Sequence, residues 1–467
     1  MSKKEIEIEH SKLNMASYGF GSMSREFVSM AFNVLVFFYY EVEINLNVWL
    51  IGLALIIFAI YNAINDPLIG YLTNRPFKFT KKWGRRFPWI LLGGLPLGFS
   101  YFLVFSPPSI DPISGAWILF GWLTFSTCLF DTFHSIFFVN FQSLFPDKFR
   151  SIDERRTATG IQIALGVVGV ALGATLPPLF ITFEDLQTYV VQGLVVMAFT
   201  LVTMLIAIPG FREDKETIDL YLTSFDKQIK RESFLKSMII AFRQKSFVAF
   251  IIIYTMYFVI INSLQASLPY FVRFVVEPKF QKTRYITFIM AGLLVGTLIS
   301  VPIWVIIAKK LNDNGKVMLI SATLLGVFVI PLAFISSYWL VIVFVFIWGW
   351  ALGGFWIMIF PVFSDVIDES IVRNAKREEG TLIGIQQFFG RLGLIIQVLS
   401  FTIVHVLTGF QEKADIQKPL AIWGIHIHAA IVPMICILIG ALFFWILYDL
   451  KPERVVANQE KIKEMGL

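Results

Sequence analysis

The sequence predicts an all-α membrane protein with twelve transmembrane helices in two pseudo-symmetric halves of six. Three observations lead to this prediction: long apolar runs, an uneven distribution of basic residues and an internal repeat. Of the 467 residues, 57% are hydrophobic and only 15% are charged. Soluble globular domains are less apolar and carry about 25% charged residues, so the composition indicates a polytopic membrane protein.

Twelve apolar runs are long enough to cross a bilayer, for which a helix needs about 20 mostly apolar residues. They lie at residues 17–40, 47–73, 87–106, 115–143, 156–182, 186–209, 246–272, 285–309, 316–336, 338–366, 380–409 and 424–449. The fourth, tenth and eleventh runs are longer than a perpendicular helix requires. We expect these helices to tilt or to extend beyond the bilayer.

Loops that are rich in lysine and arginine alternate along the chain with loops that contain few of these residues. With the N-terminus inside, the inner segments hold 31 of the 39 basic residues, the outer loops hold six, and Arg25 and Arg391 lie within spans. Basic loops remain in the cytoplasm, so we expect a multi-pass protein of the cell membrane with both termini cytoplasmic. Because the basic residues form short clusters between spans, the net charge of +6 does not indicate a nucleic-acid partner.

An internal repeat supports the division into halves. Residues 157–169 match residues 381–393 at a constant offset of 224, with six identities in thirteen positions. Each copy follows a charged inner loop and begins the fifth span of its half. We predict halves at 1–210 and 246–467 joined by a cytoplasmic linker at 211–245, an organisation typical of secondary transporters.

Polar groups within the first two spans indicate a binding site. Arg25 and Glu26 are adjacent, about 100° apart on a helix, so we expect each to meet a partner from another span. They either line a cavity or hold the bundle together as ion pairs. In span two, Asn62 and Asp66 share a face and Asn65 lies beside them. Oxygen ligands of this kind suit a hard cation, and a desolvated carboxylate can equally hold a proton.

Span four places Asp131, His134 and Ser135 within about one turn. Asp131 and His134 are spaced to form a proton relay, although His134 can equally be a packing residue. In span eleven, Gln387 and Arg391 lie one turn apart. We count Asp131, His134, Gln387 and Arg391 among the candidate substrate-binding residues.

Arg391 has no counterpart in the first half, where the repeat places Val167. An arginine within a span needs a counter-charge, which Glu26 or Asp66 could supply from the other half. Trp356 in span ten could stack on an apolar ligand face or simply pack. The glycine pairs 292/296 and 349/353 predict close helix contacts.

Opposite charges occupy the predicted inner rims of the two halves. The basic members are Arg85, Arg86, Arg155 and Arg156 in the first half, and the acidic members are Asp365 and Asp368 in the second. They could form ion pairs between the halves, a latch that would hold the transporter in one conformational state, or they could remain solvated. The sequence contains no Walker lysine loop, metal-ligand cluster or nucleophile elbow, so we expect neither an enzyme nor a cofactor beyond a coupling ion.

Four segments resemble the glycoside–pentoside–hexuronide:cation symporters of the major facilitator superfamily, a family of melibiose permease-like proteins. They are residues 18–21 (YGFG), 65–67 (NDP), 83–89 (WGRRFPW) and 365–368 (DVID). The resemblance implies the major facilitator fold and alternating access, with symport of a sugar or glycoside and H⁺ or Na⁺.

The resemblance also implies roles for individual residues. Asp66 is expected to bind the cation with Ser135 nearby, Arg25, Glu26 and Trp356 to contact the sugar, and Arg391 to lie between the two sites. The sequence departs from the family at two acidic positions, which are Asn62 and Phe138 here. The first change favours a proton as the ion, and the second favours a more apolar substrate.

We therefore expect a monomeric secondary transporter that contacts a small organic solute, a coupling cation and the lipid bilayer. A lysolipid or other amphipathic solute is the alternative substrate. A non-transporting sensor or an uncoupled facilitator is the alternative from another class.

Overall fold

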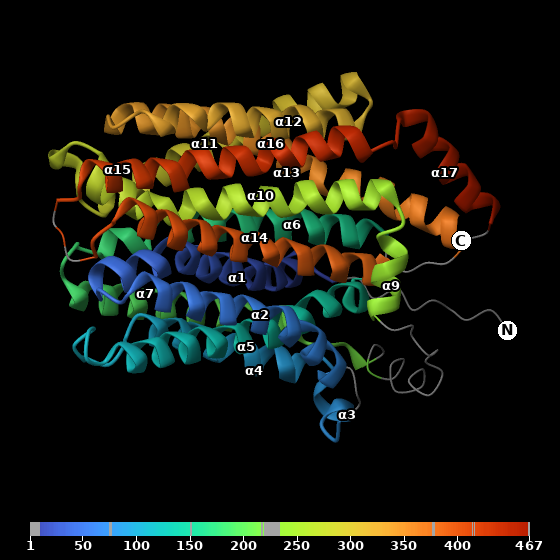
Figure 1. The fold of residues 1–467 in the computed structure, drawn as a ribbon. Coiled ribbons are helices and arrows are strands. Elements are labelled where there is room, and N and C mark those ends of the chain that lie inside the picture. Colours follow the sequence, from blue (N-terminus) through green and yellow to red (C-terminus); the bar gives the residue numbers. More distant parts are fainter. Residues whose placement is uncertain are drawn as a thin grey trace. The chain divides into compact units, whose positions relative to one another are not determined.

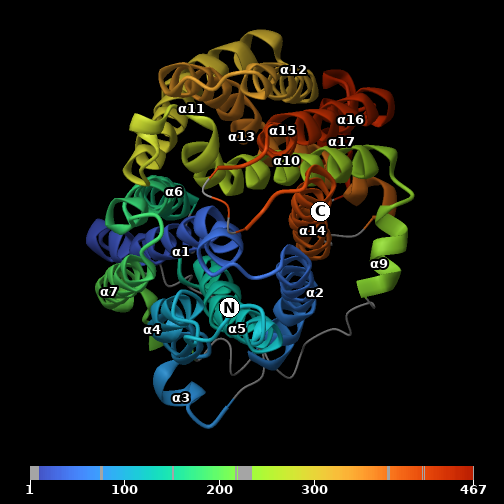
Figure 2. The same cartoon turned by 60° about the vertical axis from the view of Figure 1, so that its left-hand side comes forward.

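The structure is a computed structural model that describes residues 10–73, 77–149, 152–215, 218, 234–375, 379–412, 414 and 416–465. Throughout these residues the regular structure is helical (Figures 1 and 2). About half of the predicted linker at 211–245 lies outside the described residues, as do the basic residues Arg75 and Arg150.

The chain divides into two compact units, Met1–Ile229 and Lys230–Leu467. The helices of unit 1 are α1 (Lys12–Phe38), α2 (Val48–Thr73), α3 (Thr80–Trp83), α4 (Phe87–Val104), α5 (Ala116–Lys148), α6 (Ile152–Thr175) and α7 (Leu186–Phe211). Those of unit 2 are α9 (Phe234–Ala241), α10 (Lys245–Tyr270), α11 (Arg284–Leu311), α12 (Asn314–Phe328), α13 (Tyr338–Asn374), α14 (Glu379–Thr408), α15 (Pro419–His426), α16 (Val432–Leu447) and α17 (Pro452–Glu464). The division falls within the predicted linker.

The six long helices of each unit pack in the same pattern. In unit 1, α1 packs on α6 and α7, α2 packs on α5, and α4 packs on α5 and α7. In unit 2, α10 packs on α14 and α16, α11 packs on α13, and α12 packs on α13 and α16. These main contacts correspond helix for helix, so the predicted pair of pseudo-symmetric six-helix bundles is confirmed.

The sequence repeat marks one of these equivalent contacts. Gly169 on α6 lies directly against the backbone carbonyl of Met23 on α1, where a Cβ atom would collide. At the matching position on α14, a Cβ at Gly393 would approach the carbonyl oxygen of Thr255 on α10 to 2.9 Å. The repeated glycines therefore allow the fifth helix of each bundle to approach the first.

The predicted glycine contacts of spans eight and ten are also confirmed. Gly296 on α11 lies against the carbonyl of Phe346 on α13. In return, a Cβ at Gly353 on α13 would lie 2.8 Å from the carbonyl oxygen of Thr297 on α11. Small residues on both helices thus bring the two backbones together.

Eleven helices among the described residues are long and apolar enough to cross a membrane, and α1 is not one of them. The polar residues of α1, including Arg25 and Glu26, lower its hydropathy. Its 27 residues still extend for about 40 Å at 1.5 Å per residue, which exceeds the hydrocarbon thickness of about 30 Å. With its central place in the bundle, α1 is the twelfth spanning helix. Helices α5 and α13 extend beyond their predicted ends to Lys148 and Asn374.

Candidate substrate and cation site

A buried carboxylate on α5 meets two amides on α2. The Nδ2 atom of Asn65 donates to Oδ2 of Asp131 at 3.0 Å, and Nδ2 of Asn62 donates to Oδ1 of the same carboxylate. Asp131 is 2% exposed and Asn65 is 5% exposed. Both carboxylate oxygens therefore accept hydrogen bonds, which stabilise a negative charge away from water.

Two further oxygen-bearing side chains extend this group by one helical turn on each helix. Asp66 is four residues after Asn62 and shares its face of α2. Ser135 is four residues after Asp131 on α5 and is completely buried. Among the described residues, its Oγ atom finds no hydrogen-bond partner. We call Asn62, Asn65, Asp66, Asp131 and Ser135 the α2–α5 polar cluster.

The cluster places Asp131 differently from its sequence interpretation, in which Asp131 belonged with the substrate residues and Asp66 was the only acid that span two supplies to the cation site. The packing of α2 on α5 brings Asp131 to the predicted cation-site amides. The spacing of Asp131 and Ser135 at i and i+4 was the available signal, because it puts an acid and a predicted cation-site hydroxyl on one face.

Arg25 and Glu26 pair with each other, a contact that their 100° separation on the helix did not predict. Arg25 Nη1 forms an ion pair with Glu26 Oε1. The 100° separation fixes the directions of the two Cβ atoms, whereas the long side chains can bend towards each other beyond that point. Both remain accessible, with the Arg25 side chain 26% exposed and the Glu26 side chain 33% exposed.

An aromatic ring on α5 completes this second site. The guanidinium carbon of Arg25 lies 3.9 Å from the ring centroid of Phe138, a cation–π contact. His134 stacks on the same ring at 5.9 Å, and its Nε2 atom lies 3.4 Å from the hydroxyl of Ser29 on α1. His134 thus bridges α1 and α5. We call Arg25, Glu26, His134 and Phe138 the Arg25 site.

The predicted substrate residues of the second half lie on two helices of unit 2. Trp356 is half-buried on α13. On α14, Gln387 is exposed and Arg391 is half-buried. The expected pairing of Arg391 with Glu26 or Asp66 concerns residues of different units and stays a prediction.

The predicted gate arginines of unit 1 contact partners in their own unit. Arg85 Nη2 lies 2.7 Å from Asp147 Oδ2. Arg86 is buried, and its Nη1 atom donates to Oδ1 of Asn140 at 3.1 Å. These contacts connect the loop before α4 to the end of α5.

The remaining gate residues are distributed between the two units. Arg155 Nε donates to the backbone oxygen of Phe149 at 2.6 Å, and Arg156 is exposed. In unit 2, Asp365 accepts a hydrogen bond of 2.9 Å from Nδ2 of Asn314, and Asp368 is half-buried. The proposed latch between the halves stays a prediction.

Comparison with known proteins decides the family. The model of the family described as MFS/sugar transport protein matches residues 17–451. The chain belongs to this family. The Danio rerio protein "Sodium-dependent lysophosphatidylcholine symporter 1-A" is 20% identical over 441 residues, covering 86% of this chain and 79% of the relative. "Inner membrane symporter YicJ" of Escherichia coli (strain K12) is 21% identical over 456 residues, covering 96% and 94%.

A solved structure shows the same fold. The crystal structure of a D-xylose-proton symporter superposes with a TM-score of 0.63 at 13% sequence identity, covering 94% of this chain and 98% of the other. The match to the family model confirms the predicted membership of the major facilitator superfamily, and this superposition agrees in fold. The protein is a multi-pass membrane transporter and not an enzyme.

Proposed function

We propose that this transporter is a sodium-coupled symporter of an amphipathic solute with a zwitterionic, phosphate-bearing headgroup, and that it works by alternating access. The observation that carries the proposal is the Arg25 site, where an arginine paired with a glutamate lies on an aromatic ring. The α2–α5 polar cluster supports the choice of ion.

The Arg25 site matches the headgroup in charge. A guanidinium binds phosphate oxygens in a bidentate manner, and the Glu26 carboxylate beside it can attract a quaternary ammonium. Phe138 supplies an apolar face next to both charges, in the position where the family resemblance implies an aspartate. A sugar, with hydroxyl groups alone, would bring no charge of opposite sign to either member of this ion pair.

The α2–α5 polar cluster favours sodium. Hard cations take carboxylate, amide and hydroxyl oxygens, and the cluster supplies all three types. The expectation of a proton rested on the loss of an acid at Asn62, and Asp131 offers a second acid beside that residue. Rotation of the amides of Asn62 and Asn65 about χ2 would present their oxygens to a cation. The relatives named as sodium-dependent lysophosphatidylcholine symporters, which match this chain over most of their length, agree with this choice.

A sugar is the second candidate substrate. The matching family model carries the description MFS/sugar transport protein. Trp356 on α13 is half-buried and offers an indole face of the kind that stacks on sugar rings.

The test uses purified protein in proteoliposomes under an imposed sodium gradient or an imposed proton gradient. The substrates are a short-chain, water-soluble lysophosphatidylcholine and a panel of radiolabelled glycosides. We expect the sodium gradient alone to drive accumulation of the lysophospholipid, and a sodium ionophore to abolish it. Accumulation of glycosides would favour the second candidate. A substrate flux that depends on neither gradient would refute cation coupling. The absence of any substrate flux would indicate a non-transporting sensor.

A further inference from the structure

Residues 212–214, which follow α7, are held by hydrogen bonds to the ends of several helices of unit 1. Lys148 at the end of α5 donates from Nζ to the backbone oxygen of Arg212 at 2.7 Å. Oε1 of Glu213 accepts the backbone N–H groups of Arg86 and Phe87 at 2.5 and 3.0 Å. Residues 212–214 begin the connection to unit 2, so this part of the connection is held to α4 and α5.

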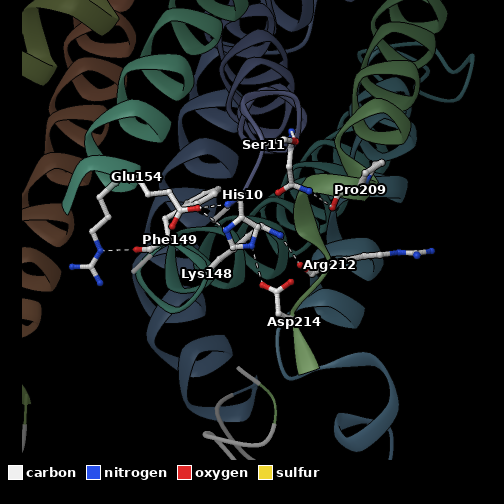
Figure 3. A network of polar contacts seen from close by, with 10 residues as sticks. His10, Ser11, Lys148, Phe149, Glu154, Pro209, Arg212 and Asp214 are labelled. Carbon is white, nitrogen blue, oxygen red and sulfur yellow. Dashed lines mark hydrogen bonds and ion pairs between the residues drawn. The ribbon is translucent and has the colours of Figure 1, made fainter. Parts of the chain in front are cut away.

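His10 fastens the same segment to α6 (Figure 3). Its Nδ1 atom lies 2.6 Å from Oε1 of Glu154, and its Nε2 atom lies 2.9 Å from Oδ2 of Asp214. Its backbone N–H also donates to Glu154 Oε1, at 2.8 Å. The side chains of His10 and Glu154 are each only 6% exposed. One imidazole ring therefore joins the residues before α1, the start of α6 and the end of α7.

This geometry selects the protonated ring. A neutral imidazole has one N–H and can donate to only one acceptor, whereas an imidazolium donates from both nitrogens. Here both nitrogens face carboxylate oxygens, from Glu154 on α6 and Asp214 after α7. The charged groups around the ring include Lys148 at the end of α5, which opposes a second positive charge. Phe149 covers the ring edge-on, with the centroids 5.4 Å apart.

The titration of the pair agrees with this protonation state. The hydrogen bond to Asp214, supported by that to Glu154, raises the pKa of His10 above its ordinary value of 6.5, although burial and Lys148 act in the opposite direction. The hydrogen bond from His10 lowers the pKa of Asp214. Because the folded-state pKa of His10 is raised, its contribution to stability is complete below about pH 6.5. That contribution is lost as the pH rises through the folded-state pKa.

We propose that His10, Glu154 and Asp214 form a proton-operated strap that holds the start of the connection between the units and slows transport when this end of the protein becomes acidic. When His10 loses its proton, one of the two carboxylate contacts loses its donor. Residues 212–214 then lose their connection to α6 through the imidazole ring, and only the contacts of Arg212 and Glu213 with α4 and α5 remain. The proton in this strap is regulatory and is not transported, so the proposal does not depend on the choice of sodium as the coupling ion.

The test follows the mobility of the strap directly. A spin label is attached to the exposed position 215 of a Lys215→Cys variant in which Cys128→Ala and Cys436→Ala remove the native thiols. We expect an immobile label in acid and a mobile label in alkali, with a midpoint above pH 6.5. His10→Gln should make the label mobile at every pH. Asp214→Asn, which retains an acceptor without the charge, should lower the midpoint.

Arg454→Gln serves as the matched control. Arg454 on α17 forms an ion pair with Glu369 at the corresponding end of unit 2, but arginine does not titrate in this range. The label at position 215 should keep its midpoint in this variant. The proposed strap would be refuted if the mobility of the label did not depend on pH. It would also be refuted if the His10→Gln variant kept the same pH midpoint of label mobility. If His10→Gln does not fold, an unchanged midpoint in Asp214→Asn is equally decisive.

A transport measurement tests the regulatory part. The initial rate of driven uptake is measured at several pH values set equally on both sides, with a constant sodium gradient. The wild-type rate should fall in acid across the range in which the label becomes immobile, and His10→Gln should lose this part of the pH dependence. Identical pH profiles for the two proteins would refute regulation by the strap. Failure of sodium coupling alone would leave the mobility result intact.

Discussion

Asn65 on α2 and Asp131 on α5 are joined by a hydrogen bond of 3.0 Å across 66 residues of sequence. Asn62 binds the other oxygen of the same carboxylate. A cation that takes these oxygens as ligands would be bound by two helices at once, and its arrival would change the interaction between them. Binding of the ion would therefore change the packing of α2 on α5 within unit 1.

Loss of the carboxylate at Asp131 should remove sodium coupling. We expect Asp131→Asn to abolish sodium-driven accumulation and to leave exchange of labelled for unlabelled substrate measurable. The apparent affinity for sodium should fall at least tenfold, about 1.4 kcal/mol. The measurement is uptake against the sodium concentration. Asp111→Asn is the control. Asp111 accepts hydrogen bonds in the loop before α5, 20 residues before Asp131 and outside the α2–α5 polar cluster.

Asp66→Asn should have the same effect if both acids serve one site. Accumulation would be lost and exchange retained. Accumulation that survives this change would show that Asp66 is structural and would leave Asp131 as the coupling acid.

Phe138 should influence which substrate is accepted. Phe138→Asp places a carboxylate beside Arg25, competes with the substrate phosphate and removes a cation–π contact of about 0.5–2 kcal/mol. We expect weaker binding of the lysophospholipid and gain of glycoside binding, measured by competition with labelled substrate. Phe138→Leu keeps an apolar face and separates the loss of the ring from the gain of the charge. Unchanged selectivity in both variants would contradict the assignment of this site.

Arg391 should matter for transport and not for folding. Arg391→Val installs the residue that the repeat has at position 167. We expect normal amounts of protein in the membrane and impaired substrate binding or coupling. Transport at the wild-type rate would refute a role for this arginine.

Gly169 should be intolerant of substitution. Gly169→Val forces side-chain atoms against the Met23 carbonyl of α1, and overpacking of this kind typically costs about 1–3 kcal/mol. A lower melting temperature of the purified protein would report it. Gly160 lies on the same helix, and a Cβ atom at this position would meet nothing within 4 Å among the described residues. Gly160→Ala should therefore be neutral or stabilising by about 0.5–1 kcal/mol.

The spanning helices could be predicted because the bilayer imposes a length and a polarity on each. The start of α2 was predicted at residue 47 and lies at Val48. The short helices α3 and α9 and the polar α17 escaped prediction, since none has a long apolar run. The ends of α5 and α13 were placed too early because both continue into polar sequence.

The site was predicted less completely, for reasons that lie in the side chains. Asp66 and Asn62 could be selected as candidates because a polar residue within an apolar span is conspicuous in the sequence alone. The meeting of Asn62 with Asp131 depends on the rotation of two helices about their axes, which hydropathy does not fix. The pairing of Arg25 with Glu26 depends on side-chain torsions and not on the helix period.

Arg454 has a practical consequence for the handling of this protein. It reaches from α17 to Glu369, the carboxylate that also receives Gln244 and Ser246 from the start of α10. A chain truncated after Leu450 would lose this ion pair, although it would keep every spanning helix. A fluorescent reporter or affinity tag is better fused beyond Glu464 than substituted for the terminal helix. At the opposite terminus, His10 argues equally against shortening the chain up to Lys12.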